Sequence, residues 1–295
     1  MANFPNFLYV GTDKAGSTFI YEILRAHPDC FVPRAKDIYY FDKNYRRGSQ
    51  WYAQFFADAM GKPCIGELSH DYLHSRVASL RIRKDLGPIR IIISLREPVS
   101  RAFSNYLFLL RHGISCGTFR DAASRFPEII EGSLYAEPVA RYLDLFGSHN
   151  VHVVLFDDIR CQPAKVQTEV CKFLQLDPAA AKPTDLTKQV LPAARPRVKF
   201  VAKLAKAGAV VSRQFGLVNL VGTVKSSSLV QQLLYSPYRN YPKITEAESG
   251  YFQDFFERDI KRTSALIGVD LGHWLRRSTA EWHSCPSEIQ INSIG

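Results

Sequence analysis

A short turn near the amino terminus, Gly11-Thr12-Asp13-Lys14-Ala15-Gly16-Ser17-Thr18, has the residues needed to bind a phosphate group. It follows an apolar run and precedes a helical pattern, so backbone amides and the positive end of the helix would surround an anion. A nucleoside triphosphate loop needs lysine directly after its second glycine, where this chain has Ser17. The only lysine of the turn is Lys14. The turn therefore predicts a phosphate site, and the displaced lysine argues against a P-loop kinase or NTPase.

A second candidate anion site follows a β-branched run, at Arg96-Glu97-Pro98-Val99-Ser100-Arg101-Ala102-Phe103-Ser104-Asn105-Tyr106. Arg96 stands where a strand is expected to end, and Ser104 falls in the helix expected to follow. An arginine at the carboxyl end of a strand in a parallel sheet faces the usual ligand crevice. We expect Arg96 and Ser104 to bind a second phosphate through charge-assisted hydrogen bonds.

The two segments together resemble those of sulfotransferases that use 3′-phosphoadenosine 5′-phosphosulfate (PAPS), particularly the heparan-sulfate and bacterial carbohydrate branch. That branch has a first loop like R-K-G-G-T, which residues 14–18 match with alanine for one glycine. Its second segment runs like R-N-P-V-x-R-A-x-S-x-Y, which residues 96–106 match with Glu97 for asparagine. Residues 37–45 resemble the family segment E-x-H-F-F-D-x-N-Y, and residues 270–274 resemble a D-L-G-x-W close.

The resemblance implies how the donor is bound. Lys14 would neutralise charge on the leaving phosphate as the sulfuryl group departs, and no metal is required. Arg96 with Ser104 would hold the 3′-phosphate. The 5′-phosphate would be held by the rest of the first loop, which is Ala15, Gly16, Ser17 and Thr18.

One cation that the family often carries is missing, because Leu68 stands where lysine is common. Arg195 or Arg197, in a basic stretch, is the expected replacement.

The acceptor hydroxyl must lose its proton as it attacks, so a histidine or carboxylate has to reach it. The heparan-type branch has glutamate at the position of Asp37, and the cytosolic branch has a K-T-H block in the place of Leu68-Ser69-His70. We favour His70, because imidazole needs little pKa adjustment to act near neutrality. Asp37 remains the alternative base. Each residue also has a purely structural reading, Asp37 as a cap and His70 as a core histidine.

Three consecutive aromatic residues, Tyr39, Tyr40 and Phe41, are candidates for the wall of an acceptor pocket. Aromatic residues at such spacing belong to the core more often than to a binding site, so a core position is the alternative.

Strands and helices alternate along most of the chain. Strand patterns cover residues 7–11, 64–68, 89–95 and 151–156, and they are rich in valine and isoleucine. Helical patterns cover residues 17–27, 75–85, 99–111, 136–146, 163–174 and 244–267. This alternation predicts the α/β class, as a P-loop-like three-layer sandwich with a central parallel sheet flanked by helices.

Length and composition favour a globular enzyme. The 295 residues are 46% apolar and 22% charged, which suits one domain over residues 1–295. No apolar run is long enough to span a membrane, and no secretion signal is recognised, so a cytoplasmic location is expected.

The six cysteines form no C-x-x-C pair and are expected to be reduced thiols. His70 and His74 are four residues apart, but the glutamate of a zinc motif is missing between them, and we expect no metal site.

The net charge of +10 is concentrated in one stretch. Residues 186–245 contain ten lysines and arginines and no acidic residue, and they are expected to form a basic helical subregion. Such a region suits an anionic donor or acceptor, and no nucleic-acid-binding motif accompanies it. Peripheral membrane contact through residues 195–225 is the minority alternative to a solvated basic face.

The sequence therefore predicts a PAPS-dependent sulfotransferase that acts on a hydroxyl acceptor, such as a carbohydrate, glycolipid or other natural product. Two rivals remain at this point. One is a P-loop kinase or NTPase, and the other is a degenerate donor-binding protein that acts as a scaffold.

Overall fold

The computed structural model describes residues 4–114, 116–181, 194–196, 235–237 and 242–275. Its centre is a sheet of five parallel strands in the order β2-β3-β1-β4-β5. The strands are β1 (Phe7–Gly11), β2 (Cys30–Phe31), β3 (Cys64–Leu68), β4 (Arg90–Leu95) and β5 (Val151–Leu155). Because all five run in the same direction, the loops after their carboxyl ends gather at one edge of the sheet.

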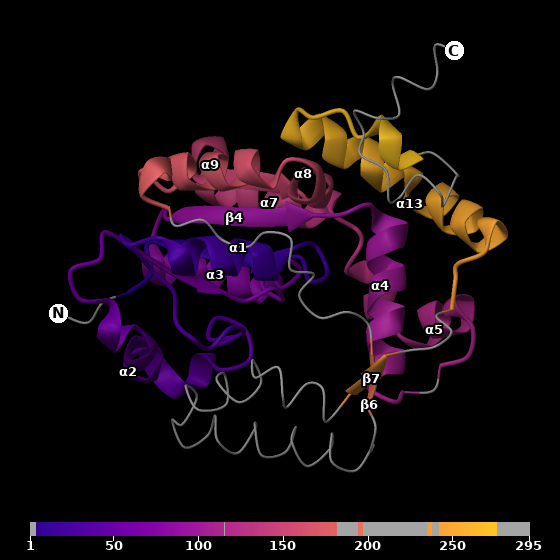
Figure 1. Ribbon diagram of the computed structural model, residues 1–295, viewed down its shortest axis with the longest axis horizontal. Helices are drawn as coiled ribbons and strands as arrows, with labels where there is room; N and C mark the ends of the chain where they lie inside the picture. The colour runs from indigo at the N-terminus through magenta and orange to yellow at the C-terminus, as the bar shows by residue number, and fades with distance from the viewer. Residues whose placement is uncertain (1–3, 115, 182–193, 197–234, 238–241, 276–295) are drawn as a thin grey trace.

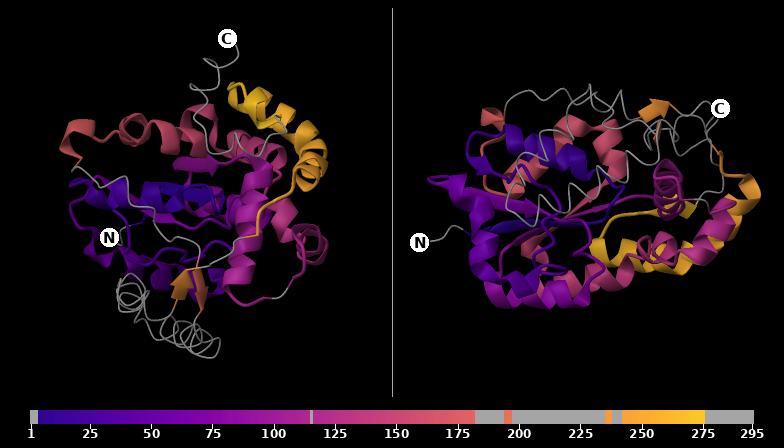
Figure 2. Two further views of the ribbon diagram at one scale, coloured as in Figure 1. Left: turned by 45° about the vertical axis from the view of Figure 1, so that its right-hand side comes forward. Right: turned by 90° about the horizontal axis from the view of Figure 1, so that it is seen from below.

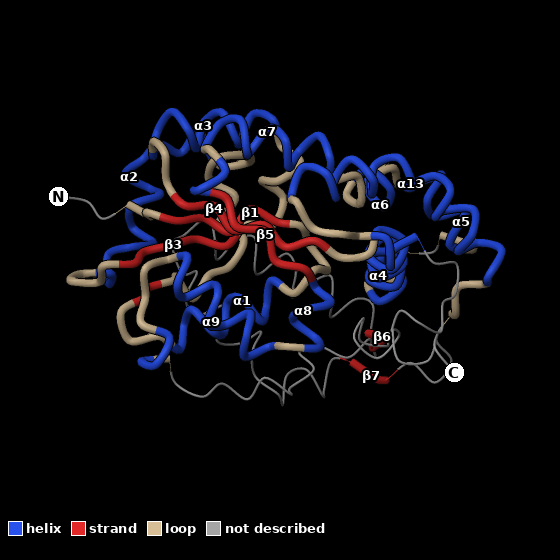
Figure 3. The backbone as a smooth tube through the Cα atoms, turned by 90° about the horizontal axis from the view of Figure 1, so that it is seen from above, coloured by secondary structure: helices blue, strands red, loops and turns tan. Residues whose placement is uncertain are grey.

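Helices cover both faces of this sheet (Figure 3). One face carries α1 (Ser17–Ala26), α8 (Phe156–Cys161) and α9 (Pro163–Phe173), and the other carries α3 (Arg76–Leu86) and α7 (Ala136–Phe146). Successive residues of a strand point to opposite faces. Accordingly, Tyr9 packs with the α1 side and Leu8 with the α7 side. The predicted α/β three-layer sandwich is confirmed.

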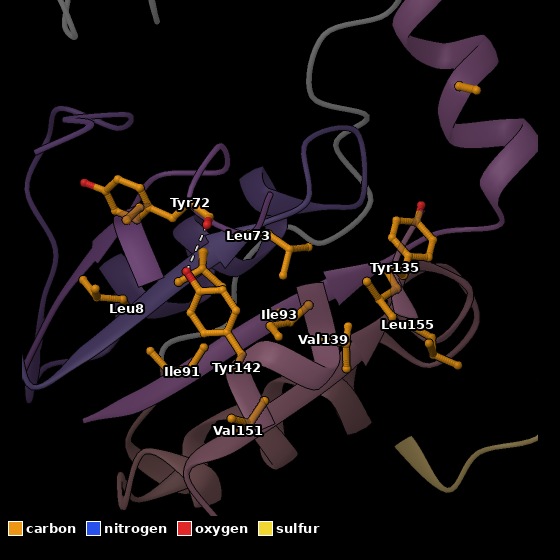
Figure 4. Close-up of a cluster of buried hydrophobic side chains, with 14 of the residues drawn as sticks. Leu8, Tyr72, Leu73, Ile91, Ile93, Tyr135, Val139, Tyr142, Val151 and Leu155 are labelled. Atoms are coloured by element: carbon orange, nitrogen blue, oxygen red, sulfur yellow. Dashed lines mark hydrogen bonds between the residues drawn. The ribbon is translucent and has the colours of Figure 1, made fainter. Parts of the chain in front are cut away.

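The core on the α7 side is built from strand residues and aromatic rings (Figure 4). Ile91 and Ile93 of β4 face Val139 and Tyr142 of α7 in this core. The Tyr142 hydroxyl donates a hydrogen bond to the Tyr72 carbonyl at 3.0 Å, so even its polar atom is satisfied within the core.

Of the other described α-helices, α4 (Pro98–Arg111), α5 (Phe119–Arg125), α6 (Glu128–Glu131) and α13 (Glu246–Ile267) lie around the carboxyl edge of the sheet. Helix α2 (Gly48–Ala53) lies towards the other end of the strands. Helix α13 packs on α7 and α4 at the end of the molecule opposite α2 (Figures 1 and 2). Its first turn is closed by a capping box between Thr245 and Glu248.

The predicted basic helical subregion at residues 186–245 stays a prediction, because the described residues do not test it as a whole. Two of its described segments are short strands, β6 (Ala194–Pro196) and β7 (Tyr235–Pro237), which pair antiparallel beside α4 (Figure 1). Each ends in proline, which lacks an amide proton and biases the preceding residue towards extended backbone. Most of residues 186–245, including Arg197 and the rest of the proposed membrane-contact stretch, lies outside the described residues.

Two further properties of the chain bear on the sequence predictions. In the described part of the chain, no helix combines the length and apolarity that membrane spanning needs. Cys30, Cys64, Cys116 and Cys171 are free, but Cys161 is disulfide-bonded, so the expectation of reduced thiols is wrong for Cys161. Scattered cysteines pair only where the fold brings them together, and their spacing does not reveal this.

Candidate active site

The first loop, residues 12–16, connects the end of β1 to the start of α1 and needs glycine at both ends. Gly11 has φ 139°, and a Cβ placed there would lie 2.4 Å from the His70 carbonyl oxygen. Gly16 has φ 94°, and its Cβ would lie 2.5 Å from Ile159 Cδ1. Larger residues at either place would push the loop away from the turn after β3 or from α8.

The first backbone amides of α1 have no side-chain hydrogen-bond acceptor and are open to a ligand, whereas those of α4 are capped by a side chain. Gly16, the residue before α1, provides no side-chain capping hydrogen bond. At α4 the Glu97 carboxylate accepts from the amides of Val99 at 2.9 Å and Ser100 at 2.6 Å. Glu97 stands where the resemblance has asparagine, and it already satisfies these amides. Of the two helices, α1 is therefore the one whose first amides can receive an anion.

The two predicted anion-binding motifs meet at the carboxyl edge of the sheet. Arg96 Nη1 donates to the Lys14 carbonyl oxygen at 3.2 Å. Its Nε and Nη2 donate to Ser100 Oγ at 2.9 and 2.6 Å. The guanidinium carbon lies 4.6 Å from the centre of the Phe156 ring. Burial lowers the pKa of Arg96, although arginine stays protonated.

Ser100 is a site residue that the sequence prediction missed. Ser104, the predicted phosphate ligand, is four residues later and therefore lies on the same face of α4. The spacing Arg96-x-x-x-Ser100 was the signal that could have revealed the contact.

Lys14 lies among cations and against an aromatic ring. Its ammonium nitrogen is 3.6 Å from the centre of the Phe108 ring. Burial lowers the pKa of Lys14 to about 8; Asp13 opposes this change, while Arg101, Arg111 and Arg96 add to it. Phe108 was not predicted as a site residue, although it follows Ser104 by four positions on the same helix.

A buried ion pair fixes the loop from the other side. Arg101 is 3% exposed, and its Nη2 pairs with the Asp13 carboxylate. Its Nη1 donates to the carbonyls of Glu128 at 3.2 Å and Ile129 at 3.0 Å. Burial alone would raise the pKa of Asp13, but the charge and hydrogen bond of Arg101 outweigh it and lower that pKa. Asp13 is therefore ionised and already paired.

Lys36 is a cation beside the first loop that sequence reasoning did not name. Its Nζ lies 3.4 Å from Thr18 Oγ1, at the start of α1, and 5.3 Å from the centre of the Tyr21 ring. Burial lowers the pKa of Lys36, and the neighbouring Asp37 opposes this. Of the two predicted arginines, Arg195 lies in β6, paired with Ser236, and Arg197 lies outside the described residues.

The two candidate bases are in direct contact. His70 Nδ1 and Asp37 Oδ1 are 2.7 Å apart. Asp37 has φ 62°, and its amide donates to the Leu68 carbonyl at 2.9 Å, which turns its side chain towards the end of β3. His70 Nε2 lies 3.1 Å from the Tyr39 hydroxyl and 3.2 Å from Asp71 Oδ1. Both ring nitrogens therefore have partners within the protein.

The charges of this pair follow from its contacts. Burial alone would lower the pKa of His70, but the hydrogen bond and charge of Asp37, with a further contribution from Asp71, raise it. The pKa of Asp37 is lowered, because the hydrogen bond and charge of His70 outweigh its burial. Each member of the pair therefore stabilises the charged form of the other.

Of the three aromatic residues predicted for an acceptor pocket, only Tyr39 lies at the site. Tyr40 is 4% exposed and stacks on Tyr52 with ring centres 4.3 Å apart. Phe41 is fully buried and packs edge-on against Tyr52 at 5.3 Å. Both are core residues, and the prediction that they line the pocket is wrong because their rings pack between α2 and the turn after β3.

A buried carboxyl group supports the acceptor side of the site. Glu67 on β3 accepts hydrogen bonds from Tyr52 at 2.5 Å, Ser69 at 2.5 Å and Tyr72 at 2.9 Å. Ser69 Oγ in turn accepts from the Tyr39 amide at 3.1 Å. Burial raises the pKa of Glu67 to about 7. This network fixes the turn that carries Asp37 and Tyr39.

Among the described residues, no group of three or more histidine, cysteine, aspartate or glutamate side chains is arranged to hold a metal ion.

Comparison with known proteins places this fold and site in a family. Residues 4–192, more than half of the chain, match the family model described as the sulfotransferase domain. The chain belongs to the sulfotransferase family.

Individual relatives agree with this assignment. The chain is 27% identical over 188 residues to heparan sulfate glucosamine 3-O-sulfotransferase 5 of Mus musculus, a match that covers 59% of this chain and 54% of the relative. The chain spans only part of the length of the curated relatives that it matches. The matched region covers 22% of one murine relative and 54% of another.

Solved structures show the same fold. A sulfotransferase from Alicyclobacillus acidocaldarius superposes with a TM-score of 0.68 at 24% identity, and the match covers 93% of this chain and all of that one. Mouse sulfotransferase SULT7A1 complexed with PAP gives a TM-score of 0.50 at 16% identity, covering 88% of this chain and 86% of that one.

Proposed function

We propose that the protein transfers the sulfuryl group of PAPS to a hydroxyl group of a carbohydrate, glycolipid or other natural product. The observation that carries the proposal is the hydrogen bond from Arg96 to the Lys14 carbonyl, because it joins two anion-binding motifs that are 82 residues apart. A donor with two separated phosphates could touch both motifs at once. The PAP-bound mouse sulfotransferase supports this donor, and the glycan named for the murine relative supports a sugar acceptor.

The residues present fit such a donor. The open first turn of α1, together with Lys14, would bind the 5′-phosphate. Arg96, with Ser100 and Ser104 on one face of α4, would bind the 3′-phosphate, and Arg96 would exchange a bond to Ser100 for one to the anion. Lys36 adds a cation beside Thr18.

Asp37 is the proton acceptor in this proposal, in place of the His70 favoured from sequence. Each ring nitrogen of His70 already faces a carboxylate, so the imidazole has no nitrogen left for an acceptor hydroxyl. The Asp37 carboxylate contacts His70 Nδ1 through Oδ1, and as an ionised carboxylate it has further lone pairs to take up the incoming proton. His70 and Tyr39 then act as positioning residues for Asp37.

When bound, PAPS would supply a sulfuryl group already activated by its bond to a phosphate oxygen. The acceptor oxygen would form a bond to sulfur as its proton moves to Asp37. The bond between sulfur and the bridging oxygen would break on the opposite side. The ammonium group of Lys14 would neutralise the charge that develops on the departing phosphate oxygen.

Calorimetry with adenosine 3′,5′-bisphosphate (PAP), compared with ATP plus Mg²⁺, tests the donor. We expect PAP to bind without metal, and Arg96→Ala to weaken binding at least a hundredfold, because a charge-assisted contact to phosphate is lost. Arg25→Ala, an exposed arginine at the other end of α1, is the matched control and should bind as the wild type does. A preference for ATP plus Mg²⁺ would contradict the proposal and support the kinase alternative.

Turnover of labelled PAPS with a panel of glycans, glycolipids and small alcohols tests the acceptor. A sulfated product from any hydroxyl-bearing acceptor supports the proposal. PAP binding without turnover of any acceptor would support the scaffold alternative instead.

A further inference from the structure

The partner of the Lys14 ammonium is an aromatic ring rather than a carboxylate. Its Nζ lies 3.6 Å from the centre of the Phe108 ring. Phe108 belongs to α4 and is 41% exposed, so its ring is held at the surface of the site instead of in the core. Ser100, Ser104 and Phe108 follow one another at intervals of four residues and share one face of the helix.

The charged groups around Lys14 do not hold its ammonium in place. Asp13 is the neighbouring anion, and it is already bound to Arg101. Arg96, which precedes α4, and Arg101 and Arg111 on α4 lie close enough to disfavour a positive charge on Lys14. Burial disfavours that charge as well. Asp13 also favours the charge on Lys14. The face of the Phe108 ring is the group in contact with the ammonium, and the negative quadrupole of the ring attracts the cation.

A ring is a suitable resting partner for a lysine that must later bind an anion. A carboxylate in this place would compete with the phosphate of the donor and would have to be displaced. The ring attracts the ammonium without carrying a net charge, so it opposes an incoming anion much less than a carboxylate would.

We propose that Phe108 is a positioning residue for Lys14: its ring holds the side chain of Lys14 at the donor site and keeps it protonated until the donor binds. The role given to Lys14 at the leaving oxygen rests on the proposed function. The effect of the ring on the charge of Lys14 does not.

Titration of Lys14 tests the proposal without any ligand. In protein labelled with ¹³C at lysine Cε, the Lys14 signal is the one lost in Lys14→Arg. We expect Phe108→Leu, which keeps an apolar side chain but removes the ring, to lower the titration midpoint by about half a pH unit. Phe108→Tyr keeps the ring and should titrate like the wild type. Phe255→Leu, at another exposed phenylalanine on α13, is the control and should also leave the midpoint unchanged.

Two results for the Lys14 titration midpoint would contradict the proposal. An unchanged midpoint in Phe108→Leu would show that the ring does not support the charge. A higher midpoint would show that the ring acts only by excluding water. Either result overturns the proposal.

Calorimetry with PAP between pH 6.5 and 9.5 separates this proposal from the proposed function. The affinity of Phe108→Leu should be close to the wild-type value at pH 6.5 and about threefold lower at pH 9, because fewer molecules carry a protonated Lys14. If PAP does not bind to the wild type but the Lys14 midpoint shifts as expected, the donor assignment is wrong and the role of Phe108 in protonating Lys14 stands. If PAP binds and its pH dependence is identical in Phe108→Leu, the proposed role of Phe108 is wrong and the donor assignment stands.

Discussion

The contact between Asp37 and His70 decides how the acceptor side of the site can work. From sequence they are rival bases, yet in the structure Nδ1 and Oδ1 are 2.7 Å apart and form one unit. A histidine between two carboxylates is a poor proton acceptor, since its charged form is the one that its neighbours stabilise. The carboxylate of Asp37 is therefore the member of the pair that is free to act.

Substitution of each member separates their roles. Asp37→Asn should lower kcat about a hundredfold to ten-thousandfold, because the proton acceptor is lost, while PAP affinity stays the same. His70→Gln keeps a donor for Asp37 and should lower kcat only about tenfold. The measurement is PAPS turnover with the acceptor that the panel identifies. A His70→Gln enzyme that is less active than Asp37→Asn would return His70 to the role of base.

Gly16 is a second position where a single residue shapes the site. Gly16→Ala should destabilise the protein by about 2–4 kcal/mol, because a left-handed residue is strained and its Cβ would meet Ile159. Gly61→Ala is the matched control, since Gly61 has φ 76° and nothing within 4 Å of an added Cβ. That variant should lose only about 1 kcal/mol from strain. Urea unfolding measures both losses, and equal losses would show that the contact with Ile159 is unimportant.

At the scale of elements, β3 links the core to the acceptor-side turn through Glu67. The three hydroxyl groups on its carboxyl come from α2, from the strand end and from the following turn. Ser69 passes this restraint to the amide of Tyr39. The end of β3 therefore fixes a turn in which both Asp37 and Tyr39 have positive φ.

Glu67→Gln should change how stability depends on pH. A carboxyl group whose pKa is raised to about 7 binds a proton more tightly in the folded state, so its contribution is present below about pH 4.5 and is lost as pH rises to 7. Relative to this variant, the wild type should therefore lose about 3 kcal/mol of unfolding free energy between pH 4.5 and pH 8. Urea unfolding at both pH values measures the difference. Exposed Glu131→Gln is the control, and a parallel pH dependence of wild type and Glu67→Gln would contradict the prediction.

Most elements that position the site could be predicted from sequence. The strand patterns at 7–11 and 64–68 match β1 and β3, and the helix predicted at 244–267 begins two residues later, after its Thr245 cap. Strand β2 was missed because two residues show no periodicity. The last residue of the predicted strand 151–156 belongs instead to α8, since a buried strand and a short buried helix look alike in sequence.

The candidate site was predictable where one motif specified it, and not where segments meet. Lys14 and Arg96 were expected to share a ligand, and they are in contact. The partners Lys36, Ser100 and Phe108 depend on the rotation of a helix or the path of a loop, which no local pattern records. Tyr40 and Phe41 were misassigned because an aromatic run looks the same at a pocket wall and in a core.

At the scale of the whole molecule, the carboxyl-terminal part of the described chain supports the donor site from outside the sheet. Asp259 of α13 accepts from the amides of Tyr135 at 2.7 Å and Ala136 at 3.1 Å, which caps α7. The Tyr135 hydroxyl donates to the Arg96 carbonyl at 2.8 Å. Residues more than a hundred positions apart in the chain thus hold the end of β4, where Arg96 emerges.

A second connection reaches the same arginine through α8. Trp274 Nε1 donates to Asp157 Oδ2 at 2.8 Å, and Asp157 follows Phe156, whose ring lies under the Arg96 guanidinium. Trp274 is 2% exposed, so the bond is shielded from water. The position of α8, and with it the platform under Arg96, therefore depends on a residue near the end of the described chain.

Trp274→Phe should show this dependence in two measurements. Losing the donor to Asp157 should lower the unfolding free energy by about 1–3 kcal/mol. It should also weaken PAP binding by about twofold to fivefold, because a shift of Phe156 by even part of an ångström loosens the support of Arg96. Ile82→Val on α3, fully buried and far from α8 in the chain, should cost about 1 kcal/mol without changing PAP affinity. If both variants bind PAP as tightly as the wild type, Trp274 contributes only to the stability of the fold. The connection from Trp274 to Arg96 then contributes nothing to PAP affinity.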